Sequence, residues 1–350
     1  MERKIKVLIV DDSTFARLSI SHRIQADNGI EVIGFAHDGL EAMDKIKELK
    51  PDVITMDVEM PHMDGLTALK RIMLESPRPV IMLSSLTGKG TATTLRALES
   101  GAVDFFLKPS ITTPAGASES AIELIEKIKM AATSRAPAPV ILPKPQSRNE
   151  VVKKDTPGNP ARRVVVIGSS TGGPRALYQV IPSLPAEISA AVLIIQHMPP
   201  GFTRAMAARL DELSAFEIKE AEAGDVLTEN RGFIAPGGYH MVVTPERKIG
   251  LNREPPVWGV RPSVDVSMES VAAVYGGRTV GVVLTGMGCD GTKGTGRLRS
   301  AGGKVLAEDA STCVVYGMPR SVYESGYANA VLPLPEIAPA IVKMLGELKE

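Results

Sequence analysis

The chain has 350 residues, enough for two domains with separate hydrophobic cores. Forty Lys and Arg residues balance forty Asp and Glu residues, so the charge does not favour nucleic acid or a membrane surface as the main partner. The two cysteines, Cys289 and Cys313, lack metal-ligand spacing, and no apolar run approaches the roughly 18 residues of a membrane-spanning helix. We therefore expect a cytoplasmic protein without membrane insertion and without a nucleic-acid partner.

Residues 4 to 132 alternate short apolar runs with amphipathic stretches of helical length, which predicts a doubly wound parallel sheet. Polar side chains follow the predicted strands, and ligands bind at this edge of such sheets. Three clustered carboxylates repel one another unless a cation intervenes, and oxygen ligands suit Mg²⁺. The expected strands are 6–10, 32–36, 53–56, 80–83 and 103–106, the last helix is about 118–132, and the polar residues are Asp11, Asp12, Asp57, Ser84 and Lys108.

This part of the chain resembles a response-regulator receiver domain with a flavodoxin-like fold. The matching segments are Val10–Ser13, Met56–Gly65, Met82–Ser85 and Phe106–Pro109. The resemblance implies that Asp57 accepts a phosphoryl group from a histidine kinase. It also implies that Asp11, Asp12 and Asp57 bind Mg²⁺, and that Ser84 and Lys108 respond to the phosphorylated state. Asp64 precedes Gly65, and this pair favours turn chemistry over a second acceptor site.

Closely spaced prolines predict an interdomain linker over residues 133–162, between a receiver domain at 1–132 and a second domain at 163–350. The second domain again alternates strand-like and helix-like stretches, so we expect another mainly parallel α/β sheet. Its expected strands are 164–168, 191–196, 232–235, 279–285 and 304–307, and its expected helices are 175–181, 202–213, 264–275, 293–301 and 334–348.

The first strand of the second domain leads into Gly168-Ser169-Ser170-Thr171-Gly172-Gly173, which contains the G-x-S-x-G pattern of an exposed nucleophilic serine. Alone, this pattern is equally typical of a glycine-rich turn or a phosphate-binding loop. A nucleophilic Ser170 needs a base, and residues 163–350 contain two histidines. His197 follows an apolar strand, whereas His240 lies in a turn where a structural histidine is expected.

The base needs an acid that fixes its tautomer, and Asp290 lies in a glycine-rich turn after another apolar strand. Spacing therefore favours Ser170, His197 and Asp290 as a catalytic set. A rival set in the α/β-hydrolase order, Ser170, Asp225 and His240, stays open on spacing alone.

The second domain resembles the catalytic domain of the chemotaxis protein-glutamate methylesterase (CheB) family. The matching segments are Gly168–Gly173, Gln196–Thr203, Ile234–Met241, Arg261–Asp265 and Leu284–Gly291. The resemblance implies hydrolysis of glutamate methyl esters on chemoreceptors, with release of methanol, and deamidation of receptor glutamines. It assigns Ser170 as nucleophile, His197 as general base and Asp290 as its partner, with no cofactor for the ester chemistry. Cys289 departs from the pattern, in which asparagine is expected.

An acyl-transfer site also needs donors for the oxyanion, and the backbone N–H groups near Thr171 and at Met287 are candidates. The two resemblances together imply a phosphorylation-activated enzyme whose unphosphorylated receiver contacts and obstructs the catalytic domain. Two other hypotheses are a non-catalytic regulator whose second half only binds a partner, and a general esterase that uses His240. A DNA-binding output is disfavoured because the second half has no basic helix.

Overall fold

The computed structural model describes residues 3–85, 88–108, 117–134 and 159–348. The chain divides into two compact units, Met1–Val140 and Ile141–Glu350, which are described separately below. Most of the predicted linker lies outside the described residues, so its limits stay a prediction. The part of the chain that the structure describes has no helix long and apolar enough to cross a membrane.

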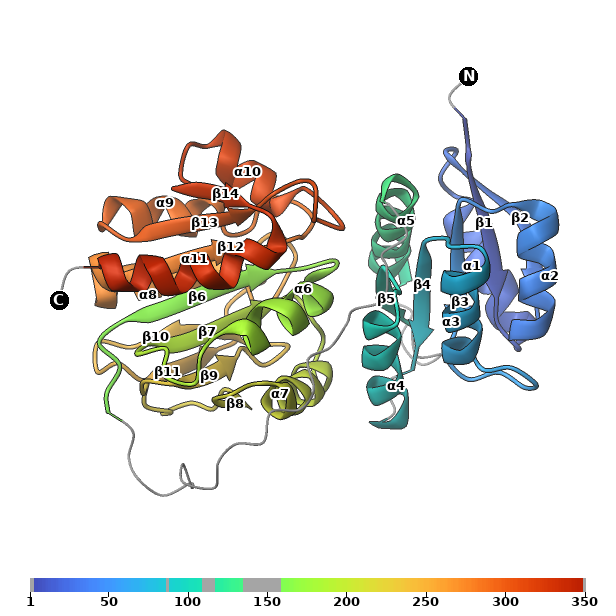
Figure 1. Ribbon diagram of the computed structural model, residues 1–350. Coiled ribbons are helices and arrows are strands. Elements are labelled where there is room, and N and C mark those ends of the chain that lie inside the picture. Colours follow the sequence, from blue (N-terminus) through green and yellow to red (C-terminus); the bar gives the residue numbers. More distant parts are fainter. Residues whose placement is uncertain (1–2, 86–87, 109–116, 135–158, 349–350) are drawn as a thin grey trace. The chain divides into compact units, whose positions relative to one another are not determined.

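Five parallel strands in the order β2-β1-β3-β4-β5 form the sheet of the first unit (Figure 1). β3 and β4 are buried along their whole length, as expected for strands covered on both faces. The predicted strands are confirmed to within two residues at each end. Their bounds are Ile5–Val10 (β1), Ile30–Ala36 (β2), Val53–Asp57 (β3), Val80–Ser84 (β4) and Asp104–Leu107 (β5).

Helices lie on both sides of this sheet, with α1 beside α5, and with α2 next to α3 and α3 next to α4. Polar N-caps start three of them, because the side chains of Ser13, Asp38 and Asp64 accept hydrogen bonds from the first turns of α1, α2 and α3. Asp64 therefore has a local backbone role. The helices are Thr14–Ile24 (α1), Gly39–Leu49 (α2), Gly65–Glu75 (α3), Gly88–Glu99 (α4) and Ala117–Thr133 (α5).

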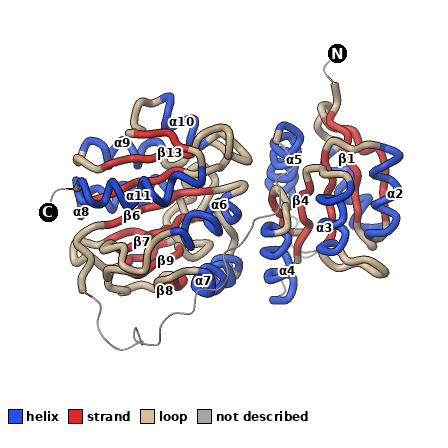
Figure 2. The backbone as a smooth tube through the Cα atoms, viewed as in Figure 1, coloured by secondary structure: helices blue, strands red, loops and turns tan. Residues whose placement is uncertain are grey.

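The second unit contains seven parallel strands in the order β14-β13-β12-β6-β7-β9-β8 (labelled in Figure 1; strands are red in Figure 2). The predicted parallel α/β class is thus confirmed for both halves of the chain. The strands are Val164–Ser169 (β6), Ala191–Gln196 (β7), Glu217–Glu220 (β8), Arg231–Ile234 (β9), Thr279–Val283 (β12), Lys304–Glu308 (β13) and Ala330–Leu332 (β14).

Helices of the second unit also form two groups, with α6 against α11 and α7, and α8 against α9. An antiparallel hairpin of β10 (His240–Val243) and β11 (Ile249–Asn252) packs beside α8. The helices are Gly173–Val180 (α6), Phe202–Leu213 (α7), Val264–Tyr275 (α8), Thr292–Ser300 (α9), Met318–Glu324 (α10) and Leu334–Glu347 (α11), with short 3₁₀ turns at Ile181–Ser183 and Gly276–Arg278.

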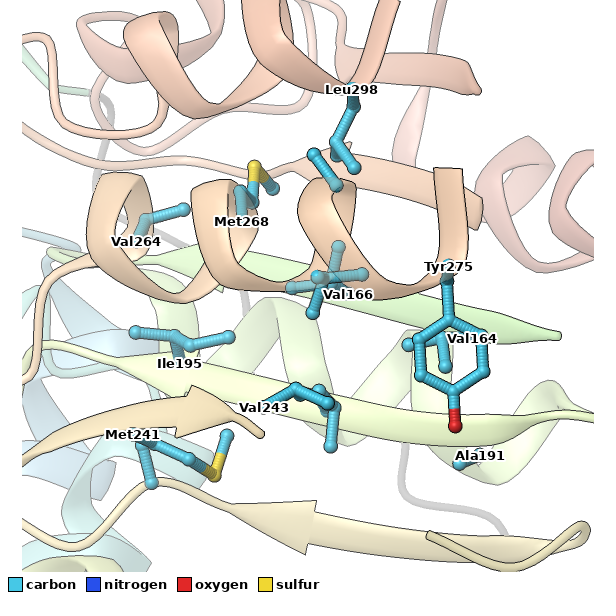
Figure 3. Packing of buried hydrophobic residues seen from close by; sticks show 14 of the residues in the cluster. Val164, Val166, Ala191, Ile195, Met241, Val243, Val264, Met268, Tyr275 and Leu298 are labelled. Atoms are coloured by element: carbon cyan, nitrogen blue, oxygen red, sulfur yellow. The ribbon is translucent and has the colours of Figure 1, made fainter. Parts of the chain in front are cut away.

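The core of the second unit joins α8 to the central strands and to the hairpin. Figure 3 shows Val164 and Val166 of β6 facing Met268 and Tyr275 of α8, with Val243 of β10 beside them. At the carboxyl end of β6 the approach is very close, because a Cβ atom at Gly168 would lie 2.3 Å from Cγ1 of Val264. A glycine here allows the first turn of α8 to lie against the end of β6.

Both sheets contain a topological switch point. In the first sheet, β1 lies between β2 and β3, so the chain adds β2 on one side of β1 and β3 on the other. In the second sheet, β6 lies between β7 and β12, so the chain adds β7 on one side of β6 and β12 on the other. Ligands of open parallel sheets bind in the crevice beyond the carboxyl ends of the strands at such points. The two places where sites are expected are therefore the carboxyl ends of β1 and β3, and those of β6 and β12.

Candidate active site and receiver site

Two adjacent serines end β6, and the structure distinguishes them. Ser169 is fully buried, and its Oγ donates a 2.7 Å hydrogen bond to Oε1 of Gln196 at the end of β7. Ser170 is partly exposed, and two hydrogen bonds hold its backbone. Its N–H donates to the Thr285 carbonyl, and its carbonyl accepts from Nε2 of Gln196. Ser169 is therefore held in the core by Gln196, whereas Ser170 is the more exposed of the two serines.

His197 lies beside Ser170 at the same edge of the sheet. In the parallel register Ser169 is opposite Gln196, so Ser170 and His197 are the next residues along their strands, and the His197 N–H donates to the Ser169 carbonyl. The imidazole is nearly buried, and its Nε2 lies 2.8 Å from Oδ2 of Asp290. This arrangement leaves Nδ1 of His197 for a second partner.

The first turn of α8 holds the Asp290 carboxylate. Oδ1 accepts hydrogen bonds from Ser263 Oγ and from the backbone of Asp265 and Gly291, while Oδ2 accepts one of 2.7 Å from the Val264 N–H. A carboxylate at a helix N-terminus is stabilised by the N–H groups and by the helix dipole. Burial opposes ionisation, but the bonds from His197 and from the helix backbone hold the pKa of Asp290 below its usual value. An ionised Asp290 is suited to stabilise an imidazolium.

His240 has a structural environment. It is fully buried, its Nδ1 accepts a hydrogen bond from the Ser263 N–H, and its Nε2 lies 3.1 Å from the Pro255 carbonyl. Asp225 instead contacts Nζ of Lys219 and the backbone of residue 222. Both ring nitrogens of His240 are therefore occupied, and the rival set Ser170, Asp225 and His240 is not assembled.

The glycine turn after β12 lies directly against the nucleophile candidate. A Cβ atom at Gly286 would lie 2.8 Å from Cβ of Ser170, so a side chain here would displace the serine. Thr285 connects the turn to the end of β6, since its Oγ1 lies 3.0 Å from the Thr171 carbonyl. The Gly286 N–H donates to the Val315 carbonyl, while Met287 is 37% exposed. Thr171 directly follows Ser170 in the chain, and Met287 directly follows Gly286, which lies against Ser170.

The polar residues of the first unit also gather at one edge. Asp11, Asp12 and Asp57 each offer an oxygen within 4.8 Å of the others. Nζ of Lys108 lies 2.6 Å from Oδ2 of Asp11 and 2.7 Å from Oδ2 of Asp57. Ser84 is buried at the end of β4, where its Oγ accepts a 2.7 Å hydrogen bond from Thr94. All five predicted receiver residues therefore lie at the carboxyl ends of the strands, as the sequence predicts.

Burial and charge both act on this cluster. Burial raises the pKa of Asp57, and the neighbouring Asp11 raises it further, against the opposing effect of Lys108. Burial disfavours the Lys108 ammonium, but its hydrogen bonds to Asp11 and Asp57 raise its pKa overall. The site therefore combines three carboxylates with the Lys108 ammonium group. Such a site is suited to bind a further cation, or an anionic group that replaces the carboxylates as the partner of Lys108.

Comparisons with known proteins agree with this geometry. A family model described as CheB methylesterase matches residues 165–341, and one described as response regulator receiver domain matches residues 7–114. A protein-glutamate methylesterase/protein-glutamine glutaminase of Symbiobacterium thermophilum is 49% identical over 99% of this chain and 99% of its own length. The chain belongs to the CheB methylesterase family.

Other CheB relatives cover the chain in the same way. A protein-glutamate methylesterase/protein-glutamine glutaminase of Thermotoga maritima is 45% identical over 98% of this chain and 99% of its own length. The crystal structure of the Thermotoga maritima CheB methylesterase catalytic domain is 46% identical and covers 52% of this chain and 97% of that one, with a TM-score of 0.51. The resemblance inferred from the sequence is thus confirmed for the family and for its receiver.

Some residues of this CheB site were not anticipated from the sequence. Ser263 and Gln196 lie in the segments that carry the resemblance, but their contacts with Asp290 and with both serines depend on the fold. Asp265 accepts from Gly294 and from the indole of Trp258, and Arg261 donates to two backbone carbonyls of residues 253 and 254.

Proposed function

We propose that this chain is a phosphorylation-activated serine hydrolase that demethylates glutamate methyl esters on methyl-accepting chemotaxis receptors and deamidates receptor glutamines. The 2.8 Å contact between His197 and Asp290, at the strand edge that presents Ser170, is the observation that carries the catalytic part. The substrate class is proposed from the relatives, which are protein-glutamate methylesterases/protein-glutamine glutaminases.

In the proposed reaction Ser170 Oγ attacks the ester carbonyl while His197 takes its proton. Because Nε2 faces Asp290, Nδ1 is the nitrogen that acts as base. The protonated imidazole then gives this proton to the departing methoxide, so methanol leaves and a glutamyl ester of Ser170 remains. Water, deprotonated by His197, hydrolyses that ester and restores the serine. With a glutamine substrate the same steps release ammonia.

The negative charge on the carbonyl oxygen needs donors during both steps. Thr171 and Met287 are the proposed sources of backbone N–H groups, because Thr171 directly follows Ser170 and Met287 directly follows Gly286, which lies against Ser170. A single donor of this kind typically contributes about 3 kcal/mol to transition-state stabilisation. The position of Gly286 against Ser170 supports a role for the turn that contains Met287.

Control of this activity is proposed to reside in the first unit, where Asp57 accepts a phosphoryl group from a histidine kinase. Asp11, Asp12 and Asp57 would hold Mg²⁺, whose charge offsets the repulsion between carboxylates and phosphoryl oxygens. Ser84 and Lys108 would bind phosphoryl oxygens, since Ser84 ends β4, the strand that pairs with β3, and Nζ of Lys108 lies 2.7 Å from Oδ2 of Asp57. We further propose that the unphosphorylated receiver contacts the catalytic unit and restricts access to Ser170.

Methanol release from methylated receptor, with and without a small-molecule phosphodonor and Mg²⁺, tests this control. The wild type is expected to respond to the phosphodonor, whereas Asp57→Ala should not. Asp64→Asn is a matched control, because it changes a nearby carboxylate to a residue that still caps α3. Equal responses of wild type and Asp57→Ala would exclude control through Asp57.

A covalent serine-directed probe tests the catalytic part separately from its control. Labelling of Ser170 that disappears in His197→Gln is the expected result. A protein whose second half only binds a partner would show no selective labelling of Ser170.

A further inference from the structure

Two histidines and an aspartate of the first unit form a second cluster of potential metal ligands, with no residue in common with the acidic cluster at Asp57. His37 and Asp38 lie in the loop between β2 and α2, and His62 lies in the loop between β3 and α3. One ligand atom from each residue lies within 4.8 Å of the other two. Nδ1 of His62 is 2.9 Å, and Nε2 of His37 is 3.3 Å, from Oδ2 of Asp38. The imidazoles are exposed and the carboxylate is buried.

The residues around this cluster resemble the outer shell of a metal site. Nδ1 of His37, on the far side of its ring, contacts Oε2 of Glu41. Glu41 is itself held by the His37 N–H at 2.7 Å and by Nζ of Lys45 at 2.6 Å. A metal-bound histidine characteristically donates its other ring N–H to a carboxylate, which fixes the tautomer and raises the basicity of the ligating nitrogen.

The aspartate is oriented in the same manner. Oδ1 of Asp38 accepts a 2.8 Å hydrogen bond from the Glu41 N–H, as the N-cap of α2, which leaves Oδ2 facing the two histidines. In a tetrahedral site with Zn²⁺ bonds of about 2 Å, two ligand atoms are separated by ~3.3 Å. The separations of 2.9 and 3.3 Å from Oδ2 of Asp38 are close to this value, and the ligand atoms of the two histidines lie within 4.8 Å of each other.

We propose that His37, Asp38 and His62 form a binding site for Zn²⁺, with Nε2, Oδ2 and Nδ1 as the three protein ligands. Imidazole nitrogen favours zinc and similar first-row ions, whereas an all-carboxylate set favours Mg²⁺. The first unit would thus select different ions at two places, one at Asp57 and one at His62.

An ion bound here would join two loops that already touch. The Gly39 N–H donates a 3.1 Å hydrogen bond to the Met63 carbonyl, directly beside the proposed ligands. His62 belongs to the segment that runs from Asp57 to the start of α3. Its φ of 58° is an unusual backbone conformation for a residue other than glycine. Zinc would therefore fix the segment that follows the proposed phosphorylation site.

Calorimetric titration of the full chain with Zn²⁺, in saturating Mg²⁺, tests the proposal. One zinc ion per chain is expected, with an affinity at least about tenfold weaker in His37→Gln and in His62→Gln. His22→Gln is the matched control, because His22 is an exposed histidine of the same unit outside the cluster, and it should bind like wild type. Unchanged binding in both cluster variants would overturn the proposal.

Two further variants test whether zinc binds at this cluster and not at Asp57. Glu41→Gln should weaken zinc binding by about 10- to 100-fold, as loss of an outer-shell carboxylate typically does. Asp57→Asn should leave it unchanged, and loss of zinc binding in that variant would place the ion in the acidic cluster and refute the assignment. Circular dichroism of each variant confirms that it is folded.

Discussion

At the scale of single residues, Ser263 links the two histidines of the second unit. Its N–H donates to Nδ1 of the buried His240, its Oγ donates to Asp290, and it caps α8. His240 therefore supports the candidate triad indirectly, by fixing the residue that orients the Asp290 carboxylate.

The variant Ser263→Ala should lower kcat by roughly 10- to 100-fold with little change in KM, because a hydrogen bond to an ionised group contributes about 1.5–3 kcal/mol. Ser267→Ala is its matched control. Ser267 lies on the same helix, but its Oγ bonds to the Met241 carbonyl and does not reach Asp290. Methanol-release kinetics of both variants provide the check, and equal losses would mean that the effect arises from the helix and not from Asp290.

A second prediction concerns a buried carboxyl beside the glycine turn. Burial raises the pKa of Glu308 to about 7, even though its Oε2 accepts a hydrogen bond from the Thr285 N–H. Between the ordinary carboxyl pKa of 4.5 and about 7 the folded protein binds more protons than the unfolded chain. The contribution of Glu308 to the free energy of unfolding is therefore complete below pH 4.5 and decreases as pH rises through about 7, by up to about 3 kcal/mol in total.

Glu308→Gln should remove this pH dependence and raise the stability of the second unit above about pH 7. Trp258 is the single tryptophan of the chain, so its fluorescence reports unfolding of this unit. Denaturant midpoints of wild type and variant across the neutral range give the comparison. If the wild type gains stability relative to the variant as pH rises, the assignment of Glu308 is incorrect.

At the scale of elements, the contact between β6 and α8 determines where Asp290 is held. Gly168→Ala would place a methyl group 2.3 Å from Cγ1 of Val264, so the variant should lose about 1–3 kcal/mol of stability through overpacking. The double variant Gly168→Ala with Val264→Ala should be more stable than the sum of the single losses predicts, because the second change removes the clash. Denaturant unfolding followed at Trp258 measures this coupling, and strictly additive losses would argue against a direct clash.

Long apolar strands and periodic helices were predictable from the sequence because their hydrophobic patterns are strong. The predicted ranges Ala191–Gln196, Phe202–Leu213 and Val264–Tyr275 agree with the structure residue for residue. Short or polar elements were not predicted. β8 has the sequence Glu-Ile-Lys-Glu, β14 has three residues, and α10 is a seven-residue helix with a proline in its first turn.

Residues of the candidate sites were predictable from the sequence where a polar side chain follows the end of a predicted strand. Ser170, His197, Asp290 and Asp57 each follow an apolar run, so their position could be inferred from local pattern. The contacts of Ser263, Gln196 and Glu308 could not, because they join segments that are distant in sequence and meet only in the folded sheet. The choice of Nε2 of His197 for Asp290 likewise depends on ring orientation, which no sequence pattern specifies.

At the scale of the whole molecule, the two units are proposed to divide control from chemistry. A chelator that removes Mg²⁺ should abolish the response of methanol release to phosphodonor and leave the basal rate unchanged. In the proposed mechanism Ser170 is activated by His197, whereas phosphorylation of Asp57 would depend on the charge of an ion held by the carboxylate cluster. Loss of the basal rate on chelation would contradict this division.

The two serines at the end of β6 provide the most direct test of the account. Ser170→Ala should lower methanol release from methylated receptor at least about 1,000-fold, as removal of a nucleophile in a triad does. Ser169→Ala removes a hydroxyl one residue away that is buried against Gln196, and it should keep the rate within about tenfold of wild type. A Ser170→Ala enzyme that retains its rate, or a Ser169→Ala enzyme that loses as much, would contradict the proposed active site.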